Sequence, residues 1–107
     1  MQIVESTRFA FSIGKFLEAF KALELHLRRL IIENNRPFRS TRLQDILDVA
    51  TRLGLLDKHD LATINDLKPM RNAAAHMNVD FTRAQAQQAL VLVRDLIKKT
   101  SVNEPAA

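Results

Sequence analysis

Residues 9–31 have the sequence FAFSIGKFLEAFKALELHLRRLI, in which large apolar residues recur at alternating steps of four and three. Such steps place side chains on one face of an α-helix, because the helix has about 3.6 residues per turn. Asn34, Asn35 and then Pro37 are expected to end this helix, since the residue before a proline resists the helical conformation. The pattern therefore predicts one long amphipathic helix, with a stripe formed by Phe9, Ile13, Phe16, Phe20, Leu23, Leu27 and Leu30 and widened by Leu17 and Ile31.

Two shorter helices are expected to follow. The run from Thr41 to Gln44 has capping-box spacing, and apolar residues continue at helical intervals as far as Leu53. Gly54 stands where a left-handed residue commonly ends a helix. Asp57 is expected to cap the next helix, and Pro69 should kink or restart it because proline lacks the backbone donor that a helix interior requires.

The last helix is expected to begin at a second capping-box spacing, from Thr82 to Gln85. Its predicted inward face consists of Ala86, Ala89, Leu90, Val93, Leu96 and Ile97. Residues from Thr100 onward are polar or small, and we predict one domain over 1–100 with a frayed tail at 101–107. No segment has the alternation of a strand. The prediction is an all-α fold, a four-helix up-and-down bundle with a long first helix, because the connections are short.

The composition excludes several classes of protein. A chain of 107 residues has the size of one domain, and it contains no cysteine for a disulfide framework, a thiol nucleophile or a thiolate zinc site. Its longest uninterrupted apolar stretch, Ala89 to Val93, is far shorter than the roughly 20 residues that cross a bilayer. The first residues lack the basic and apolar regions of a secretory signal. We therefore expect a cytoplasmic protein without a membrane partner.

Positive charge is concentrated in residues 28–42, which we call the basic block. The block holds five arginines against one glutamate, a balance of +4 that equals the net charge of the whole chain. Arginine presents a fork of donors matched to phosphate oxygens, so Arg39 and Arg42 are predicted to contact RNA. The alternative is a solvated face that keeps the protein soluble. The block contains only one aromatic residue, Phe38, and so lacks the interleaved aromatic residues of an extended stacking platform for single strands.

Residues 71–76 have the sequence RNAAAH and form the one stretch that predicts chemistry. Asn72 and His76 are four residues apart and share a helix face, so Asn72 can orient the imidazole. Arg71 lies about 140° away from His76 around a regular helix, and a second copy of the chain could supply the missing convergence. A two-fold axis here would place two arginines and two histidines around one cleft, and the three alanines would allow close approach. The alternative is an exposed helix end, where the cation and the imidazole interact favourably with the negative C-terminal end of the helix dipole.

This motif, with an amphipathic helix on each side, resembles the signature of HEPN domains (the higher-eukaryote and prokaryote nucleotide-binding superfamily). That signature is an arginine, a polar residue that is often asparagine, a few variable residues and a histidine. The similarity covers the order of helices in the whole chain, and Arg71, Asn72 and His76 at the level of residues. Family members are helical bundles that dimerise across the motif, and many are ribonucleases, often toxins or antiviral effectors. Because both Arg71 and His76 are present, the resemblance favours an active member.

The resemblance implies a metal-independent cleavage of RNA, without a cofactor, in which a ribose 2′-OH attacks the adjacent phosphate. The products would carry a 2′,3′-cyclic phosphate and a 5′-OH. His76 would transfer protons, Arg71 would stabilise charge on the phosphorane oxygens, and Asn72 would hold His76 or contact the phosphate. Lys68, just before the motif, is predicted as a further RNA-binding residue, with a plain surface lysine as the alternative.

The resemblance also implies partners: a second copy of the chain joined through the Arg71–His76 segment, RNA, and an inhibitory antitoxin or regulatory protein. In members paired with minimal nucleotidyltransferase antitoxins, a modified tyrosine often stands two residues after the histidine. Here that position is Asn78, and the chain has no tyrosine, so control by tyrosine modification is not expected.

Two other functions remain open. One is a non-catalytic HEPN module for dimerisation or nucleotide binding. The other is a helix-turn-helix DNA-binding protein, because Ala50 to Leu55 has the small residue, spacing and turn glycine of that motif. Asp57 and Asp60 at the start of the following helix would be repelled by DNA. His26 is predicted to be a solvated or interface residue, and His59 a surface residue.

Overall fold

The computed structural model describes residues 2–34, 37–76 and 82–101. Met77, Asn78 and all but the first residue of the predicted tail lie outside these ranges. Within them the chain forms four helices and no strand, which confirms the all-α fold with a long first helix. The helices are α1 (Gln2–Glu33), α2 (Leu43–Arg52), α3 (Lys58–Ala75) and α4 (Arg83–Ser101). None of them has the length and apolarity that a membrane-spanning helix requires.

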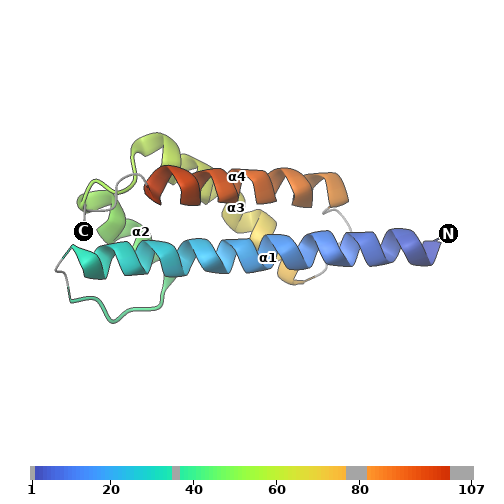
Figure 1. Cartoon of the computed structure of the whole chain (residues 1–107), viewed down its shortest axis with the longest axis horizontal. Helices are drawn as coiled ribbons and strands as arrows, with labels where there is room; N and C mark the ends of the chain where they lie inside the picture. The colour runs from blue at the N-terminus through green and yellow to red at the C-terminus, as the bar shows by residue number, and fades with distance from the viewer. Residues whose placement is uncertain (1, 35–36, 77–81, 102–107) are drawn as a thin grey trace.

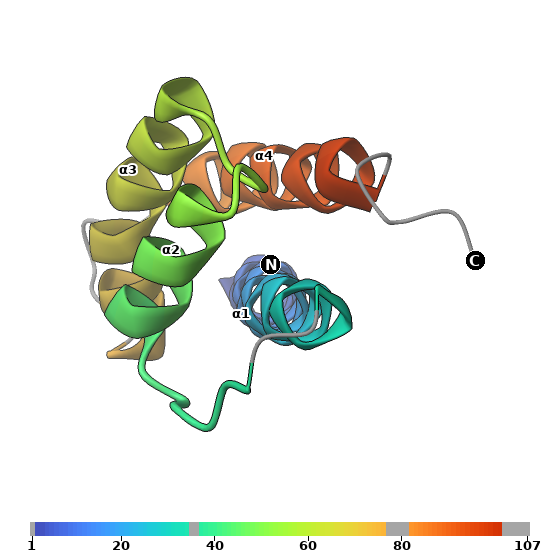
Figure 2. The same ribbon diagram turned by 90° about the vertical axis from the view of Figure 1, so that its left-hand side faces the viewer.

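Helix α1 is the axis of the molecule, and the other three helices all pack against it (Figure 1). Helix α4 runs beside α1 in the same direction, so that His26 near the end of α1 meets Thr100 near the end of α4. Helices α2 and α3 form an antiparallel pair that passes α1 at a steep angle (Figure 2). The directions therefore differ from a strict up-and-down order. Helix α2 has ten residues, about 15 Å, and crosses α1 instead of running back along it (Figure 2).

The predicted apolar stripe of α1 is the centre of the core. Phe16 and Phe20 are fully buried and lie edge to face, with ring centroids 6.1 Å apart. Facing side chains from the other helices complete the core, including Leu47, Ile64 and Val93. The buried members of the stripe are Ile13, Phe16, Phe20, Leu23, Leu27, Leu30 and Ile31. Burial of this stripe against three helices accounts for a single continuous core.

The helix ends follow the capping signals with one exception. Gly54 has a φ of +77°, and the Leu55 N–H donates to the Ala50 carbonyl at 2.9 Å, as in a Schellman motif. The predicted start of α2 at Thr41 is wrong, because Arg42 is the N-cap residue and its side chain makes no capping bond. Ser40 organises this end instead, donating to Asp45 at 2.6 Å.

The other two capping predictions are confirmed. The Asp57 side chain accepts from the Asp60 N–H at 2.8 Å, and Asp60 accepts from the Asp57 N–H at 3.2 Å. Thr82 and Gln85 form the same reciprocal pair at the start of α4. Pro69 does not restart α3, which continues through it to Ala75. The carbonyl of Asn65, which loses its donor to Pro69, belongs to an exposed residue, so water can replace the missing bond.

Candidate active site at the end of α3

Arg71 is anchored against α1 near the end of α3. Its Nη1 lies 3.2 Å from Oε1 of Glu24, and its Cζ lies 5.2 Å from the ring centroid of Phe20. The Glu24 side chain is only 11% exposed, whereas Arg71 keeps 35% of its side chain exposed. Lys21 adds a second cation 3.8 Å from Oε2 of Glu24. An ion pair and a cation–π contact therefore fix the arginine while leaving donors open to solvent.

His76 is the C-cap residue of α3, and its side chain is exposed. Its backbone N–H donates to the Asn72 carbonyl at 3.1 Å. The imidazole has no hydrogen bond to any residue that the structure describes. The predicted hydrogen bond between the Asn72 amide and the imidazole is also absent among the described residues. Oδ1 of Asn72 instead lies 3.5 Å from Nη2 of Arg71. Asn72 is thus placed beside the arginine, and the imidazole is open to solvent.

The three alanines of the motif do not form one small-residue surface. Ala74 is 1% exposed and belongs to the core, Ala73 is half-buried, and Ala75 is exposed. The prediction that all three would admit another backbone is therefore too broad. Within the described residues, the surface available at this helix end comes from Ala75, Asn72 and His76, with the open edge of Arg71 beside them.

The basic block divides into arginines that hold the fold and arginines that face solvent. Arg28 donates to the carbonyls of Ser40 at 3.3 Å and Phe38 at 3.4 Å, which ties the loop after α1 to that helix. Arg39 and Arg42 are exposed, and neither guanidinium forms a hydrogen bond or ion pair with a described residue. That these two arginines contact RNA stays a prediction. Arg29 instead forms an ion pair with Glu33 at 2.8 Å.

Lys68 links α3 to α2. Its Nζ donates to Oε1 of Gln44 at 2.9 Å, and the residue is half-buried. This hydrogen bond is solvent-exposed, so the RNA-binding role and the alternative of a surface lysine both stay predictions. The ammonium has further donors for a phosphate, and the bond to Gln44 places it at the N-terminal end of α2.

The N-terminus of α3 is closed by a cluster of charges. Nζ of Lys99 lies 2.8 Å from Asp60, which is almost fully buried, and 3.1 Å from Asp57. The Asp60 N–H and then Lys99 hold the pKa of Asp57 below its ordinary value. Asp60 and then Asp57 raise the pKa of Lys99. Both carboxylates form the cap and pair with Lys99 of α4. A DNA-reading helix would have to present these two carboxylates to phosphates, which would repel them.

The sequence interpretation misses two features of α1: the ion pair of Glu24 and the burial of His26. Glu24 follows Phe20 by one helical turn on the edge of the apolar stripe, and a carboxylate in that position signals a cation opposite it. His26 was predicted to be solvated or at an interface, but it is 9% exposed, with Nε2 2.9 Å from the Thr100 hydroxyl. Thr100 follows Leu96 by four residues, so the helical period itself places it on the buried face. His59 is exposed, as predicted.

The fold and the motif define an all-α helical bundle with an anchored arginine and an open histidine at one helix end. No protein-family model, curated protein or solved structure matches this chain. No group of three or more His, Asp or Glu side chains that could hold a metal ion occurs in residues 2–34, 37–76 and 82–101. The function is therefore proposed from the chemistry of the motif.

Proposed function

We propose that this protein is a metal-independent endoribonuclease of the HEPN type that acts as a homodimer joined through the Arg71–His76 segment. The observation that carries the proposal is the contrast between two side chains at the same helix end. Arg71 is held in place by Glu24 and Phe20, whereas the exposed His76 imidazole has no partner among the described residues. Phosphate transesterification requires a fixed cation and a free proton carrier, and the proposed dimer would bring the two together.

In the proposed reaction the ribose 2′-oxygen attacks phosphorus, and the bond to the 5′-oxygen of the next nucleotide breaks. One imidazole of the dimer takes the proton of the 2′-OH, and the other, already protonated, gives a proton to the leaving 5′-oxygen. Arg71 donates to the phosphorane oxygens through the part of its guanidinium that remains exposed. Asn72 beside Arg71 contributes a donor to the same phosphate.

Single-stranded RNA is the proposed substrate, contacted by Arg39, Arg42 and Lys68. A cellular ribonuclease of this type, a toxin or a defence effector in the cytoplasm, would be restrained by an antitoxin or regulatory protein. A non-catalytic dimerisation or nucleotide-binding module is the second candidate, because the exposed motif can serve binding alone. The helix-turn-helix alternative is disfavoured, because Asp57 and Asp60 occupy the N-terminus of α3 and pair with Lys99.

The test is incubation of the purified protein with single-stranded RNA in EDTA, followed by analysis of the product ends. We expect 2′,3′-cyclic phosphate and 5′-OH ends, and a loss of about 10²- to 10⁴-fold in His76→Gln. His59→Gln is the matched control, since His59 is also an exposed histidine of α3. Both variants should unfold at the wild-type temperature. RNA left intact by the wild type, or equal rates in His76→Gln and His59→Gln, contradicts the proposal.

A further inference from the structure

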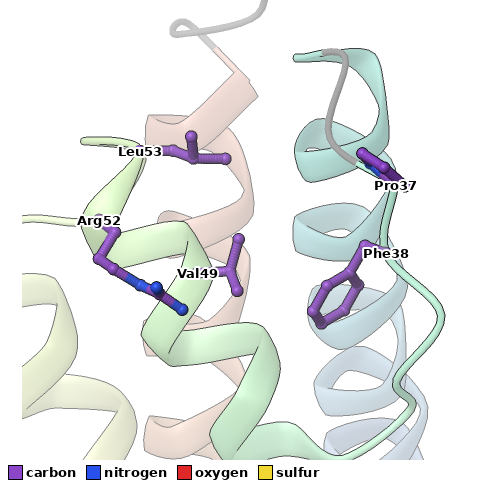
Figure 3. Close-up of a pocket in the computed structure, with 5 residues that line it drawn as sticks. All are labelled: Pro37, Phe38, Val49, Arg52 and Leu53. Atoms are coloured by element: carbon purple, nitrogen blue, oxygen red, sulfur yellow. The ribbon is translucent and has the colours of Figure 1, made fainter.

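A pocket of about 230 Å³ lies between the loop after α1 and the C-terminal half of α2 (Figure 3). Pro37 and Phe38 form one wall, and Val49 of α2 and its C-cap residue Leu53 form the other. The ring of Phe38 faces Val49 across the opening, and Arg52 lies on the α2 side. The pocket therefore combines an aromatic face, an opposing aliphatic face and one guanidinium.

Tertiary contacts hold both walls in place. Arg28 of α1 donates to the carbonyls of Phe38 and Ser40, so the loop cannot swing away without losing two hydrogen bonds. The Phe38 ring is half-buried and packs against the core. The opposite wall is fixed because α2 ends in the Schellman motif at Gly54. The pocket is thus formed before any ligand arrives, which lowers the entropic cost of binding.

The chemistry of the lining fits a planar heteroaromatic ring that carries an anion. Base rings stack on aromatic side chains whatever their identity, and an adjacent arginine can pair with the attached phosphate. The carboxylate of Asp48 accepts from the Gln44 amide at 2.8 Å. In the Arg52 guanidinium only Nε donates a hydrogen bond, to the Asp48 backbone carbonyl at 3.5 Å. The terminal nitrogens have no partner within the described residues.

We infer that this pocket is a base-binding subsite for the RNA strand, with Phe38 stacking on one base and Arg52 binding its phosphate. The inference rests on the proposed ribonuclease function. It also explains why Arg39 and Arg42, in the same loop and at the start of α2, face solvent without partners in the described chain. The three arginines and Lys68 then contact one strand.

The position of the pocket sets how much RNA is needed. Lys68 and Arg42 mark the N-terminal end of α2, and the pocket lies at its C-terminal end. Ten helical residues span about 15 Å, which is about four stacked nucleotides at 3.4 Å each. Lys68 and the pocket therefore lie at opposite ends of α2, and we expect a dinucleotide to be too short to contact both.

The experiment measures binding separately from cleavage, in His76→Gln with EDTA present. Fluorescence anisotropy of a labelled single-stranded RNA gives the affinity for this protein and for the same protein carrying Phe38→Leu or Arg52→Gln. Phe38→Leu keeps an apolar side chain but removes the stacking face, and we expect at least about fivefold weaker binding, since a stacked base contributes about 1–3 kcal/mol. Arg94→Gln on α4 removes an exposed arginine that does not line the pocket, and this variant should bind like the parent.

Two further measurements separate stacking from other effects. With an abasic strand, the difference between the parent and Phe38→Leu should disappear. An RNA with 5-iodouridine, irradiated in the complex, should crosslink to Phe38, and peptide mapping distinguishes this residue from the other five phenylalanines in a chain without Trp or Tyr. Circular dichroism confirms that Phe38→Leu folds, and Arg52→Gln tests the same pocket through an exposed side chain.

Equal affinities of parent, Phe38→Leu and Arg52→Gln, or crosslinks confined to other residues, overturn the subsite. Displacement of the RNA probe by uridine monophosphate as effectively as by unlabelled RNA also overturns it, in favour of a site for free nucleotides. The ribonuclease proposal is tested apart from this. Cleavage in EDTA without an effect of Phe38→Leu removes only the subsite, whereas Phe38 crosslinking without cleavage removes only the nuclease.

Discussion

The guanidinium of Arg71 lies 3.2 Å from the carboxylate of Glu24, a residue 47 positions earlier in the chain. The carboxylate is largely buried, so this pair loses more water than an exposed ion pair and is less screened by salt. Phe20, one turn earlier on α1, adds its ring face to the same guanidinium. Together they couple the middle of α1 to the end of α3 and restrict where the arginine can point.

Arg71→Lys distinguishes a catalytic arginine from a structural one. Lysine keeps the positive charge for Glu24 but lacks the planar fork that binds two phosphate oxygens. We expect RNA cleavage to fall by about 10²-fold or more, with the unfolding temperature nearly unchanged. Cleavage assays in EDTA and thermal unfolding provide the two measurements. Wild-type cleavage by Arg71→Lys would mean that the arginine serves the fold through its charge alone.

The fold could be predicted because its signals are local. The stripe of α1, the capping pairs at Asp57 and Thr82, and the glycine after α2 each act within a few residues of the chain. The relative direction of the helices was not predictable in this way. It depends on how α2 crosses α1, and a short connection is compatible with more than one crossing.

The candidate site could be predicted only in part. The motif itself marks Arg71, Asn72 and His76, but Glu24 contacts Arg71 across 47 residues and no pattern joins them. The burial of His26 was missed for the same reason, since its partner Thr100 lies 74 residues away. Polar residues at the edge of an apolar stripe are ambiguous until the facing helix is known. In both cases the partner from a distant helix decides whether the polar group is exposed or bound.

Neutralising two exposed arginines should change how RNA binding depends on salt. Arg39 and Arg42 have no described partner, so the double change Arg39→Gln and Arg42→Gln removes charge without breaking an ion pair of the fold. If each contacts one phosphate of a single strand, the slope of log affinity against log salt should become shallower by about 1.4. Anisotropy titrations at several salt concentrations measure this slope, with Arg94→Gln as the control. A slope equal to that of the control would exclude both residues from the RNA contact.

The charge cluster at the start of α3 should make stability depend on acid. Hydrogen bonds from the Asp60 N–H and from Lys99 lower the pKa of Asp57 from its ordinary 3.8. The ionised carboxylate therefore stabilises the fold above that value, and this contribution is lost as the pH falls through the lowered pKa. Asp57→Asn keeps a good N-cap side chain but does not titrate, so its unfolding free energy should fall less between pH 5 and about pH 2. Urea unfolding across this range measures the difference.

Asp66→Asn is the matched control for that measurement, because Asp66 is an exposed aspartate of the same helix without a partner among the described residues. Its acid dependence should follow the wild type. Lys99 should show the opposite dependence of stability at high pH. Because its pKa is raised, its contribution to the unfolding free energy is complete below pH 10.5 and is lost as the pH rises through the raised pKa. Identical acid profiles for Asp57→Asn and the wild type would show that the cap does not depend on ionisation.

Two glycine-to-alanine changes should shift stability in opposite directions for reasons of backbone conformation. Gly54 has a φ of +77°, which alanine adopts at a cost, and a Cβ there would meet nothing within 4 Å. The cost is therefore conformational, about 1 kcal/mol of unfolding free energy. Gly14 lies inside α1, and a Cβ there also meets open space, so Gly14→Ala should raise stability by about 0.5–1 kcal/mol. Urea unfolding of both variants at neutral pH gives the comparison. Because Gly14 lies outside the motif, the basic block and the pocket walls, RNA cleavage should be unchanged in Gly14→Ala, and a loss of stability in this variant would mean that its surface is covered in the protein in solution.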